Sequence, residues 1–402
     1  MTRLGPIRWT RRQYWSADQS AVVPVDALVD RAEATVSLGV RESCCRLGVG
    51  EGSFARAAED LSYLGNIMLS AETVRTIVED EGRRAILWCR EEQLLFDFEG
   101  PSEAEPPLLE ARRPDPRQEV LGTKDPVEGE VLRVYASMDG VQTPTVTETE
   151  KAKRRRSAGQ RRRRLRTQGR SLRPLRPRRR GTDQRWKEMK IVTFYNQGSS
   201  WRQVAATVRD HVAAGRLLRE EGAKIGVGSI EQIVAPVDGA PYIRKQMERR
   251  LPAQTQLVLD FFHLGEHVHA SRRDIYGEQS PQGTAWAEQQ LHTLRHASPE
   301  ESWQKLMDWR SSLSGKKRRA SADALLGYVG ERKEMLRYAE CDRHGWDVGS
   351  GPMESMCKAM TRRLKGRGMR WDRCNIEAMS ALECLYQSNQ SAAYWKWQLQ
   401  QN

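Results

Sequence analysis

Three carboxylates stand out because of the residues around them. Asp139 follows the alternating run VLRVYASM, Asp238 follows IVAPV, and Glu354 lies in GSGPMESMCK. The two aspartates each end a predicted strand and precede a glycine, which would let another backbone or a phosphate approach closely. Gly351 and Pro352 predict that a helix begins just before Glu354. The sequence therefore predicts two strand ends and one helix start that each present an acidic side chain.

Such a carboxylate set suits phosphodiester chemistry. Magnesium prefers hard oxygen ligands, and two ions about 4 Å apart can hold the attacking and leaving oxygens of an in-line displacement. Asp139, Asp238 and Glu354 are therefore our candidate catalytic residues and ligands of Mg²⁺ or Mn²⁺, with two ions in the site. The alternative is three unrelated surface acids among 53 Asp and Glu residues, which spacing alone does not exclude.

A second cluster lies in LDFFHLGEHVHA, where Asp260 again ends a predicted strand and is therefore a rival of Asp238. His263 and His267 are one helical turn apart and could bind zinc, but no third ligand is evident and no HExxH is present. We favour a structural role for this cluster, with His263 hydrogen-bonding near the active site.

Positive charge is concentrated in one insert. Lys151 to Arg180 hold 16 Lys or Arg and no acid, so the net charge of +13 falls to −3 without them. This favours a polyanion partner over the alternative of a solubilising tail, since each cation on a phosphate releases a counterion. Because the insert has little apolar surface to bury, we expect it to be disordered without DNA, projecting between two strands.

A second basic stretch, from Lys358 to Arg373, follows Glu354. The helix that begins before Glu354 has Met353, Met356, Met360 and Leu364 at helical spacing, which predicts a buried stripe with cations on the polar face. Trp371 could stack on a base, but packing is the favoured role. The candidate DNA-binding residues of both stretches are Arg154, Arg155, Arg156, Arg161, Arg162, Arg163, Arg164, Lys358, Arg362, Arg363, Lys365, Arg367 and Arg370. Lys316 to Arg319 form a smaller patch, which could be only a solvated loop.

Other chemistry is disfavoured. The seven cysteines form no CxxC pair, so we expect buried thiols in a reducing cytoplasm and no thiolate zinc site. The chain has no apolar leader at its start and no run of about 18 apolar residues, so we expect no membrane partner.

The order of elements predicts an α/β protein. A helical N-terminal domain (1–98) contains two short helices around Gly65 and Ser70, either a helix-turn-helix or a plain helical hairpin. A Pro- and Glu-rich linker (99–129) leads to a core (130–280) with the basic insert at 151–182. In the core we predict strands up to Asp139, through 141–150 as an irregular or edge strand, and at 186–196. A helix at 201–221, a strand at 230–237, a helix at 241–250, a strand at 255–260 and a further helix follow. An all-α insertion (281–345) precedes the C-terminal catalytic and basic helices (346–402), near 352–366 and 373–388.

The segments YASMDGV, RWKEMKIVTFYN, VDGAPYI, VLDFFHLGEHVHA and VGSGPMESMCKAMTRRLKGRGMRW, in this order, resemble bacterial insertion-sequence DDE transposases of the Kra group, which are similar to mutator-like transposases. The resemblance covers roughly residues 35 to 390, and its last motif is long and specific. It implies an RNase H-like core with an all-α insertion, and it carries the family's Asp, Asp and Glu onto Asp139, Asp238 and Glu354. Asp260 and His263 match the family's Asp/Cys-x-x-His motif. The family usually has tryptophan where this chain has Tyr242.

The resemblance implies metal-dependent cleavage at the ends of a mobile element, followed by strand transfer of the freed 3′-hydroxyl into target DNA. The implied partners are double-stranded DNA, as terminal inverted repeats and target, and further copies of the chain as a dimer or larger. The implied place is the bacterial cytoplasm, on the nucleoid. Three alternatives stay open: an RNase H-like nuclease without strand transfer, a DNA-binding protein derived from a transposase, and an RNA-binding protein with an arginine-rich arm.

Overall fold

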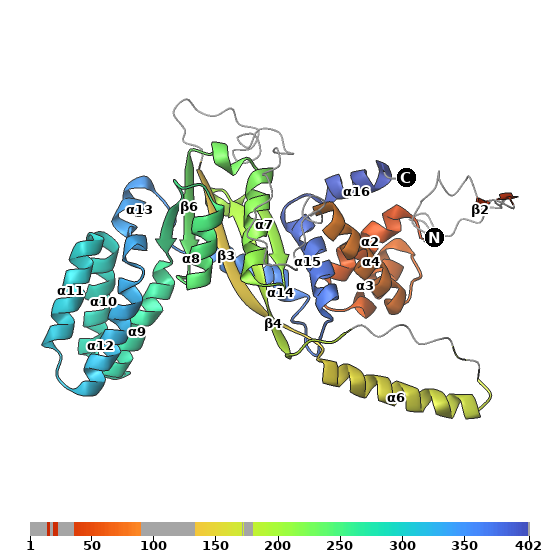
Figure 1. Cartoon of the computed structure of the whole chain (residues 1–402), viewed down its shortest axis with the longest axis horizontal. Coiled ribbons are helices and arrows are strands. Elements are labelled where there is room, and N and C mark those ends of the chain that lie inside the picture. Colours follow the sequence, from red (N-terminus) through yellow and green to blue (C-terminus); the bar gives the residue numbers. More distant parts are fainter. Residues whose placement is uncertain are drawn as a thin grey trace.

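The computed structural model describes residues 14–16, 19–22, 36–89, 133–170, 172 and 180–400. The predicted linker at 99–129 lies outside these residues. The prediction of an α/β protein is confirmed, since helices surround a five-stranded mixed sheet (Figure 1). A separate pair of short strands, β1 (Tyr14–Ser16) and β2 (Gln19–Val22), lies within the N-terminal domain (1–98) that was predicted to be helical.

The central sheet has the strand order β5-β4-β3-β6-β7. Its members are β3 (Arg133–Pro144), β4 (Trp186–Tyr195), β5 (Arg202–Thr207), β6 (Gln232–Val237) and β7 (Gln256–Leu259). Strand β4 is antiparallel to both β3 and β5, whereas β6 runs parallel to β3 and β7 runs parallel to β6. The predicted strands at 186–196, 230–237 and 255–260 are confirmed.

Two predictions about the sheet were wrong. The predicted helix at 201–221 is strand β5 followed by α7 (His211–Lys224), because Arg202–Thr207 completes an antiparallel ladder along β4. Asp210 then caps α7 through the Ala213 N–H at 2.9 Å. Strand β3 also does not end at Asp139: it continues to Pro144 because β4 pairs with it along this whole length.

Helices cover both faces of the sheet. Helices α7, α8 (Pro241–Arg250) and α9 (Phe261–Tyr276) share one apolar core with the sheet and with the insertion. The insertion comprises α10 (Pro281–His296), α11 (Pro299–Ser312), α12 (Lys316–Gly330) and α13 (Tyr338–His344), as predicted for 281–340. Short 3-10 turns occupy Gln197–Ser199, Val227–Ser229 and Lys333–Met335.

The other core joins the two ends of the chain. It contains β4 and β5 residues, α14 (Gly351–Arg362), α15 (Arg373–Gln387) and α16 (Ser391–Gln400), together with α2 (Leu38–Gly50), α3 (Phe54–Gly65) and α4 (Ala71–Cys89). Helix α15 lies between the N-terminal helices and the sheet (Figure 1). A Cβ on Gly82 of α4 would lie 2.4 Å from the Ala378 carbonyl oxygen, so α4 and α15 are in backbone contact.

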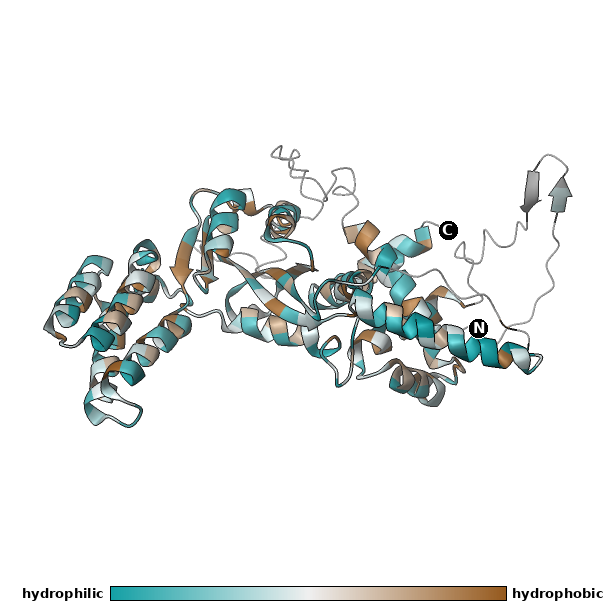
Figure 2. Ribbon diagram, turned by 60° about the horizontal axis from the view of Figure 1, so that its bottom comes forward, coloured by the Kyte–Doolittle hydropathy of each residue, from teal (hydrophilic) through white to brown (hydrophobic). Residues whose placement is uncertain are grey.

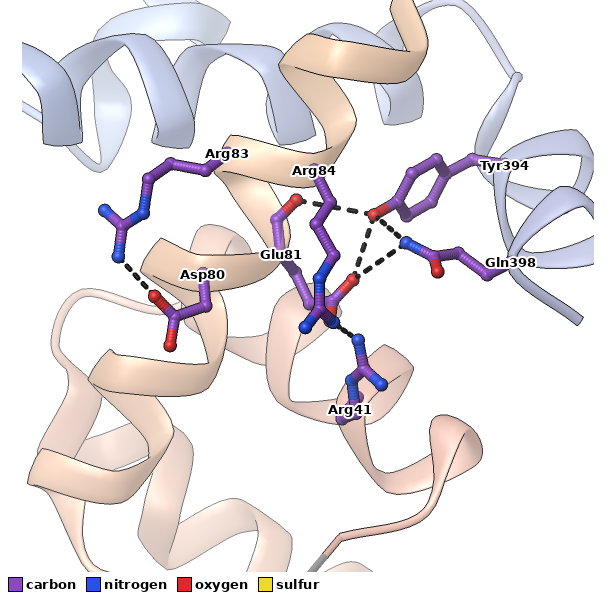
Figure 3. A network of polar contacts seen from close by, with 7 residues as sticks. All are labelled: Arg41, Asp80, Glu81, Arg83, Arg84, Tyr394 and Gln398. Atoms are coloured by element: carbon purple, nitrogen blue, oxygen red, sulfur yellow. Dashed lines mark hydrogen bonds and ion pairs between the residues drawn. The ribbon is translucent and has the colours of Figure 1, made fainter. Parts of the chain in front are cut away.

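The buried carboxylate of Glu81 joins three of these helices. Glu81 of α4, 1% exposed, pairs with Arg41 of α2 and, at 2.6 Å, with Arg84. The Tyr394 hydroxyl donates to its second oxygen at 2.9 Å, and Gln398 donates to the same oxygen (Figure 3). Helices α2, α4 and α16 therefore meet at one charge that is fully hydrogen-bonded.

The basic insert is not disordered as predicted, because its first part forms α6 (Glu148–Thr167). Thr147 and Glu150 make a reciprocal capping box, and arginine, lysine, alanine and glutamine favour helix. No residue of α6 is buried, and the side of the helix seen in Figure 2 is mostly hydrophilic. The helix projects from the sheet as an arm about 30 Å long at 1.5 Å per residue. Residues 171 and 173–179 of the insert lie outside the described part of the chain.

Candidate active site

Asp139 lies on β3, and Asp238 directly follows the end of β6, the parallel strand next to β3. Partners on β3 and β6 differ by 99 in residue number, as in Arg133 with Gln232, and 238 − 139 is also 99. The Ser137 hydroxyl donates to the Pro236 carbonyl at 2.8 Å, which keeps the two strands adjacent beyond their ladder. Residues level on parallel strands point to the same face, so the two carboxylates are brought together.

Asp260 extends the same row but is occupied by structural contacts. Partners on β6 and β7 differ by 22, as in Val237 with Leu259, and 260 − 238 is also 22. Asp260 is 1% exposed. One of its oxygens accepts the N–H groups of Phe262 and His263 at 2.7 and 2.9 Å, and the other accepts both the N–H and the hydroxyl of Ser350. Both carboxylate oxygens of Asp260 are therefore occupied by hydrogen bonds, which favours Asp238 over Asp260 as the metal ligand.

The contact with Ser350 positions Glu354. Ser350 is the residue before α14, and the Phe261 N–H also donates to the Val348 carbonyl at 2.9 Å, so the β7–α9 junction holds the start of α14. The predicted stripe of Met353, Met356, Met360 and Leu364 is buried, as expected. Glu354 is exposed, and its side chain lies 3.9 Å from the Lys358 ammonium.

Cys357 links α14 to the aspartate row. Its thiol lies 3.4 Å from Asp139 Oδ2, and it is one helical turn after Glu354, so both residues lie on one face of α14. The negative charges of Asp139 and Glu354 both act on this thiol and, after burial, help to raise its pKa far above the usual range. Asp139 and Asp238 thus lie close together where β6 ends, and Glu354 is carried by α14, which packs against β3.

The pKa of Asp139 is raised because its carboxylate is partly buried and lies near a second carboxylate. Burial is the main cause that raises its pKa, and the charge of Asp238 adds to this rise. The Gly140 N–H, which donates to Oδ1 at 2.6 Å, the Cys357 thiol and His263 act in the opposite direction. His263 therefore lies close enough to act on the row, and its side chain is 3.6 Å from Glu266. His267 of the same helix instead stacks on Tyr328 with ring centroids 3.7 Å apart.

Three residues near this site were not predicted from the sequence. The carboxylate of Glu188 on β4 occupies the place where a Gly140 Cβ would be, with Oε1 at 2.2 Å from that position, and it pairs with Lys190 at 2.9 Å. Tyr242, at the start of α8, contacts Glu188, and burial plus the charges of Glu188, Asp238 and Asp139 raise its pKa. The charged residues in the first half of β4, which include Glu188 and Lys190, were the available signal.

The donor chemistry of the aspartate pair fits a hard divalent cation. Asp238 uses Oδ1 to accept the Ala240 N–H at 2.8 Å, and its Oδ2 has no hydrogen-bond partner among the described residues. Asp139 is destabilised as an anion by burial and by Asp238, a cost that a cation would relieve. Within the described ranges, no three His, Cys, Asp or Glu side chains are grouped closely enough to hold an ion. Glu354 would therefore have to turn away from Lys358 to join the pair.

The predicted DNA-binding residues fall into two neighbouring places. The arginines predicted on the insert, Arg154, Arg155, Arg156, Arg161, Arg162, Arg163 and Arg164, lie on α6. Lys358, Arg362, Lys365, Arg367 and Arg370 are exposed on α14 and the loop after it. Arg370 pairs with Glu150, and Lys151 pairs with Asp372 at 2.8 Å, so the base of the arm is fastened to that loop.

Arg363 was wrongly predicted to contact DNA. It is 4% exposed, donates to the Gly48 carbonyl at 3.0 Å, and its guanidinium lies over the rings of Phe54 and Trp371. Burial lowers its pKa to about 10. Trp371 is buried as favoured, and its indole N–H donates to the Leu364 carbonyl at 2.9 Å.

The remaining features are structural. Ser70 caps α4 through the Thr73 N–H at 3.1 Å, as predicted. Because α4 packs on α15 through Gly82, the geometry favours the helical-hairpin interpretation over a recognition helix. Lys316, Lys317 and Arg318 are exposed at the start of α12. Five of the seven cysteines are buried, whereas Cys89 is half-buried and Cys374 is exposed. Among the described residues, no helix has the length and apolar character needed to cross a membrane.

Comparison of the chain with models of known protein families gave no match, and comparison with curated proteins also gave none.

Proposed function

We propose that this protein is a DDE transposase, which cleaves DNA at the ends of an insertion sequence and joins those ends to target DNA. The observation that carries the proposal is that Asp139 on β3 and Asp238 at the end of its parallel neighbour β6 share one register, with α14, the helix that carries Glu354, held beside Asp139 by Cys357. The mixed five-stranded sheet supports an RNase H-like core, and the helices inserted before Glu354 agree with the resemblance seen in the sequence.

Asp139, Asp238 and Glu354 would hold the Mg²⁺ or Mn²⁺ ions. Bound there, a pair of divalent ions supplies an activated water and stabilises the charge on the leaving oxygen. Asp139 and Asp238, both anchored to the rigid sheet, would fix where the ions bind. Asp260 does not contact substrate in this proposal. It binds Ser350, the residue before α14, and so positions the helix that carries Glu354.

Arginines on α6 and cations on α14 supply affinity for the DNA backbone. The arm and the loop after α14 are joined by Glu150 with Arg370 and by Lys151 with Asp372, so the two basic stretches meet at the base of the arm and would act as one basic surface. Duplex DNA is the partner that best fits this surface, because a long exposed basic helix matches a regular phosphate backbone. The proposed assembly on DNA is a homo-oligomer, and the proposed place is the bacterial nucleoid.

A strand-transfer assay on labelled terminal-repeat DNA with Mg²⁺ or Mn²⁺ tests this function. Wild type should join ends to target, and Asp139→Asn, Asp238→Asn and Glu354→Gln should bind the DNA but neither cleave nor join it. Asp308→Asn, an exposed carboxylate on α11, is the matched control and should be active.

Other outcomes would replace the proposal. Cleavage without joining would indicate a nuclease, and DNA binding without chemistry in either metal would indicate a DNA-binding protein. A strong preference for structured RNA over duplex DNA would indicate an RNA-binding protein. Full activity of Asp238→Asn, with none in Asp260→Asn, would assign the second ligand to Asp260.

A further inference from the structure

Phe262 is a large apolar side chain presented to solvent beside the carboxylate row. It is 69% exposed, although it is the second residue of α9, whereas the preceding Phe261 packs on Tyr338 with ring centroids 5.1 Å apart. An exposed aromatic ring gives up the hydrophobic stabilisation that burial would provide. Its exposure at a candidate active site therefore points to a role in binding.

The backbone of Phe262 is fixed to the site. Its N–H donates at 2.7 Å to Asp260, the same carboxylate whose other oxygen holds Ser350 at the start of α14. The next residue, His263, is the one whose charge acts on Asp139. Phe262 therefore stands between the aspartate row and the helix that carries Glu354.

The ring of Phe262 also has a fixed position, because it packs against Gly349 in the loop before α14. A Cβ on Gly349 would lie 2.8 and 2.9 Å from the ring carbons Cε2 and Cδ2 of Phe262, so the ring occupies the space of the missing side chain. Gly349 is not among the glycines with positive φ, so its backbone conformation does not demand glycine. The ring thus lies on the loop before α14 on one side and is open to solvent on the other.

The surroundings of the ring suit a nucleobase better than a protein. The nearby exposed side chains on α9 and α14 are charged or polar: those of Glu266, Lys358 and Glu354 are 78%, 81% and 53% exposed. Protein interfaces bury rings in cores that are depleted of charge. Stacking, by contrast, needs one open ring face and accepts any base, and enzymes that act on DNA often take a nucleotide out of the stack.

We propose that Phe262 is a substrate-positioning residue on which the base next to the cleaved phosphodiester stacks. This inference rests on the proposed function. Stacking would hold the end of the DNA strand in line with the carboxylates, without requiring a particular base. Gly349 would keep the ring in place, and Asp260 would fix its backbone.

The test is a binding cycle with two duplexes, the terminal repeat and the same repeat with an abasic site next to the cleaved phosphodiester. Phe262→Leu keeps an apolar side chain but removes the ring. It should bind the intact repeat at least about five-fold more weakly than wild type, and it should bind the abasic repeat as well as wild type does.

Gly349→Ala, which displaces the ring, should show the same pattern. Phe262→Trp should bind both duplexes like wild type. Leu399→Ala, an exposed apolar residue on α16, is the control and should change neither.

Equal losses on both duplexes, or no loss on either, would overturn the stacking role. A loss that appears together with dissociation of the oligomer in light scattering would overturn it in favour of a contact between protein chains. If wild type does not prefer the terminal repeat over random DNA and cleaves neither, the proposed function fails and this inference fails with it. Normal cleavage by wild type with no base-dependent effect of Phe262→Leu rejects the stacking role alone.

Discussion

At the scale of the residue, a buried acid beside another acid is costly to ionise. The pKa of Asp139 in the folded protein lies above its ordinary value of 3.8, mainly because of burial. A raised folded pKa means that the fold favours the protonated form, so this residue costs stability increasingly as the pH rises from its unfolded pKa to its folded pKa, and the full cost remains at higher pH. The ionised Asp139 thus lowers the stability of the fold, and a bound cation would offset this loss.

Asp139→Asn should therefore melt at a higher temperature than wild type at pH 7. The difference should shrink as the pH falls toward about 4, where the carboxylate becomes protonated. Wild type should gain thermal stability on addition of Mn²⁺, and the variant should gain less, because only the folded site binds the ion. Calorimetry at both pH values, with and without Mn²⁺, measures these effects. A variant that melts lower at pH 7, or that gains as much from Mn²⁺, would contradict this account of Asp139.

The adjacent Arg362 and Arg363 should behave oppositely, since only the second is buried. Arg363→Ala leaves the Gly48 carbonyl without its donor and opens a cavity against Phe54, so it should cost about 2–3 kcal/mol in the free energy of unfolding. Arg362→Ala should stay within about 0.5 kcal/mol of wild type and lower the salt dependence of DNA binding. Urea unfolding and DNA titrations separate the two effects. A destabilised Arg362→Ala with a stable Arg363→Ala would reverse the assignment.

At the scale of the element, the basic arm is a helix because its first turn is held by tertiary and capping contacts. The capping box at Thr147 starts it, and Gly181 donates to Glu148 at 2.6 Å, so the chain that returns from the insert is tied to the first turn. The charges along α6 repel one another, but residues of high helix propensity and a fixed first turn offset the cost of starting a helix.

Replacing Arg161, Arg162, Arg163 and Arg164 with glutamine should keep α6 helical and remove four phosphate contacts. The slope of log affinity against log salt should then fall by up to about 3.6, at about 0.9 for each contact. Circular dichroism checks the helix, and titrations at several salt concentrations give the slope. The matched control replaces Lys316, Lys317 and Arg318 at the start of α12 and should change the slope less. Equal changes would mean that net charge, rather than the arm, sets the affinity.

At the scale of the whole molecule, the two chain ends and the sheet form one unit. Helix α15 packs on β5 on one side and on α4 on the other, and Glu81 joins α2 and α4 to α16. The N-terminal helices therefore should not unfold independently of the sheet.

Glu81→Ala should destabilise the protein by about 3–5 kcal/mol, because it leaves the buried Arg41 without its carboxylate. The neighbouring Asp80→Ala removes an exposed carboxylate paired with Arg83 and should change stability by less than about 0.5 kcal/mol. Denaturant unfolding followed by far-UV circular dichroism and tryptophan fluorescence should show coincident transitions in both. An early separate transition in wild type would show that the N-terminal helices fold by themselves.

The sequence alone determined the local elements and the residue types of the site. Apolar runs predicted β6 and β7, Gly351 and Pro352 predicted the start of α14, and the methionine spacing predicted its buried stripe. These features depend on neighbours within a few residues, through alternation, capping and helical period, so they can be read along the chain.

Only the tertiary structure decided which of these residues meet. The register that levels Asp139 with Asp238, and the contacts that commit Asp260 to Ser350, join residues up to about a hundred positions apart. Arg363 has the same neighbours in sequence as Arg362, yet it is buried by Gly48 and Phe54 from the other end of the chain. Strand β5 forms because β4 offers it a free edge. Register, burial and pairing are set by contacts between distant segments, and local sequence patterns do not contain them.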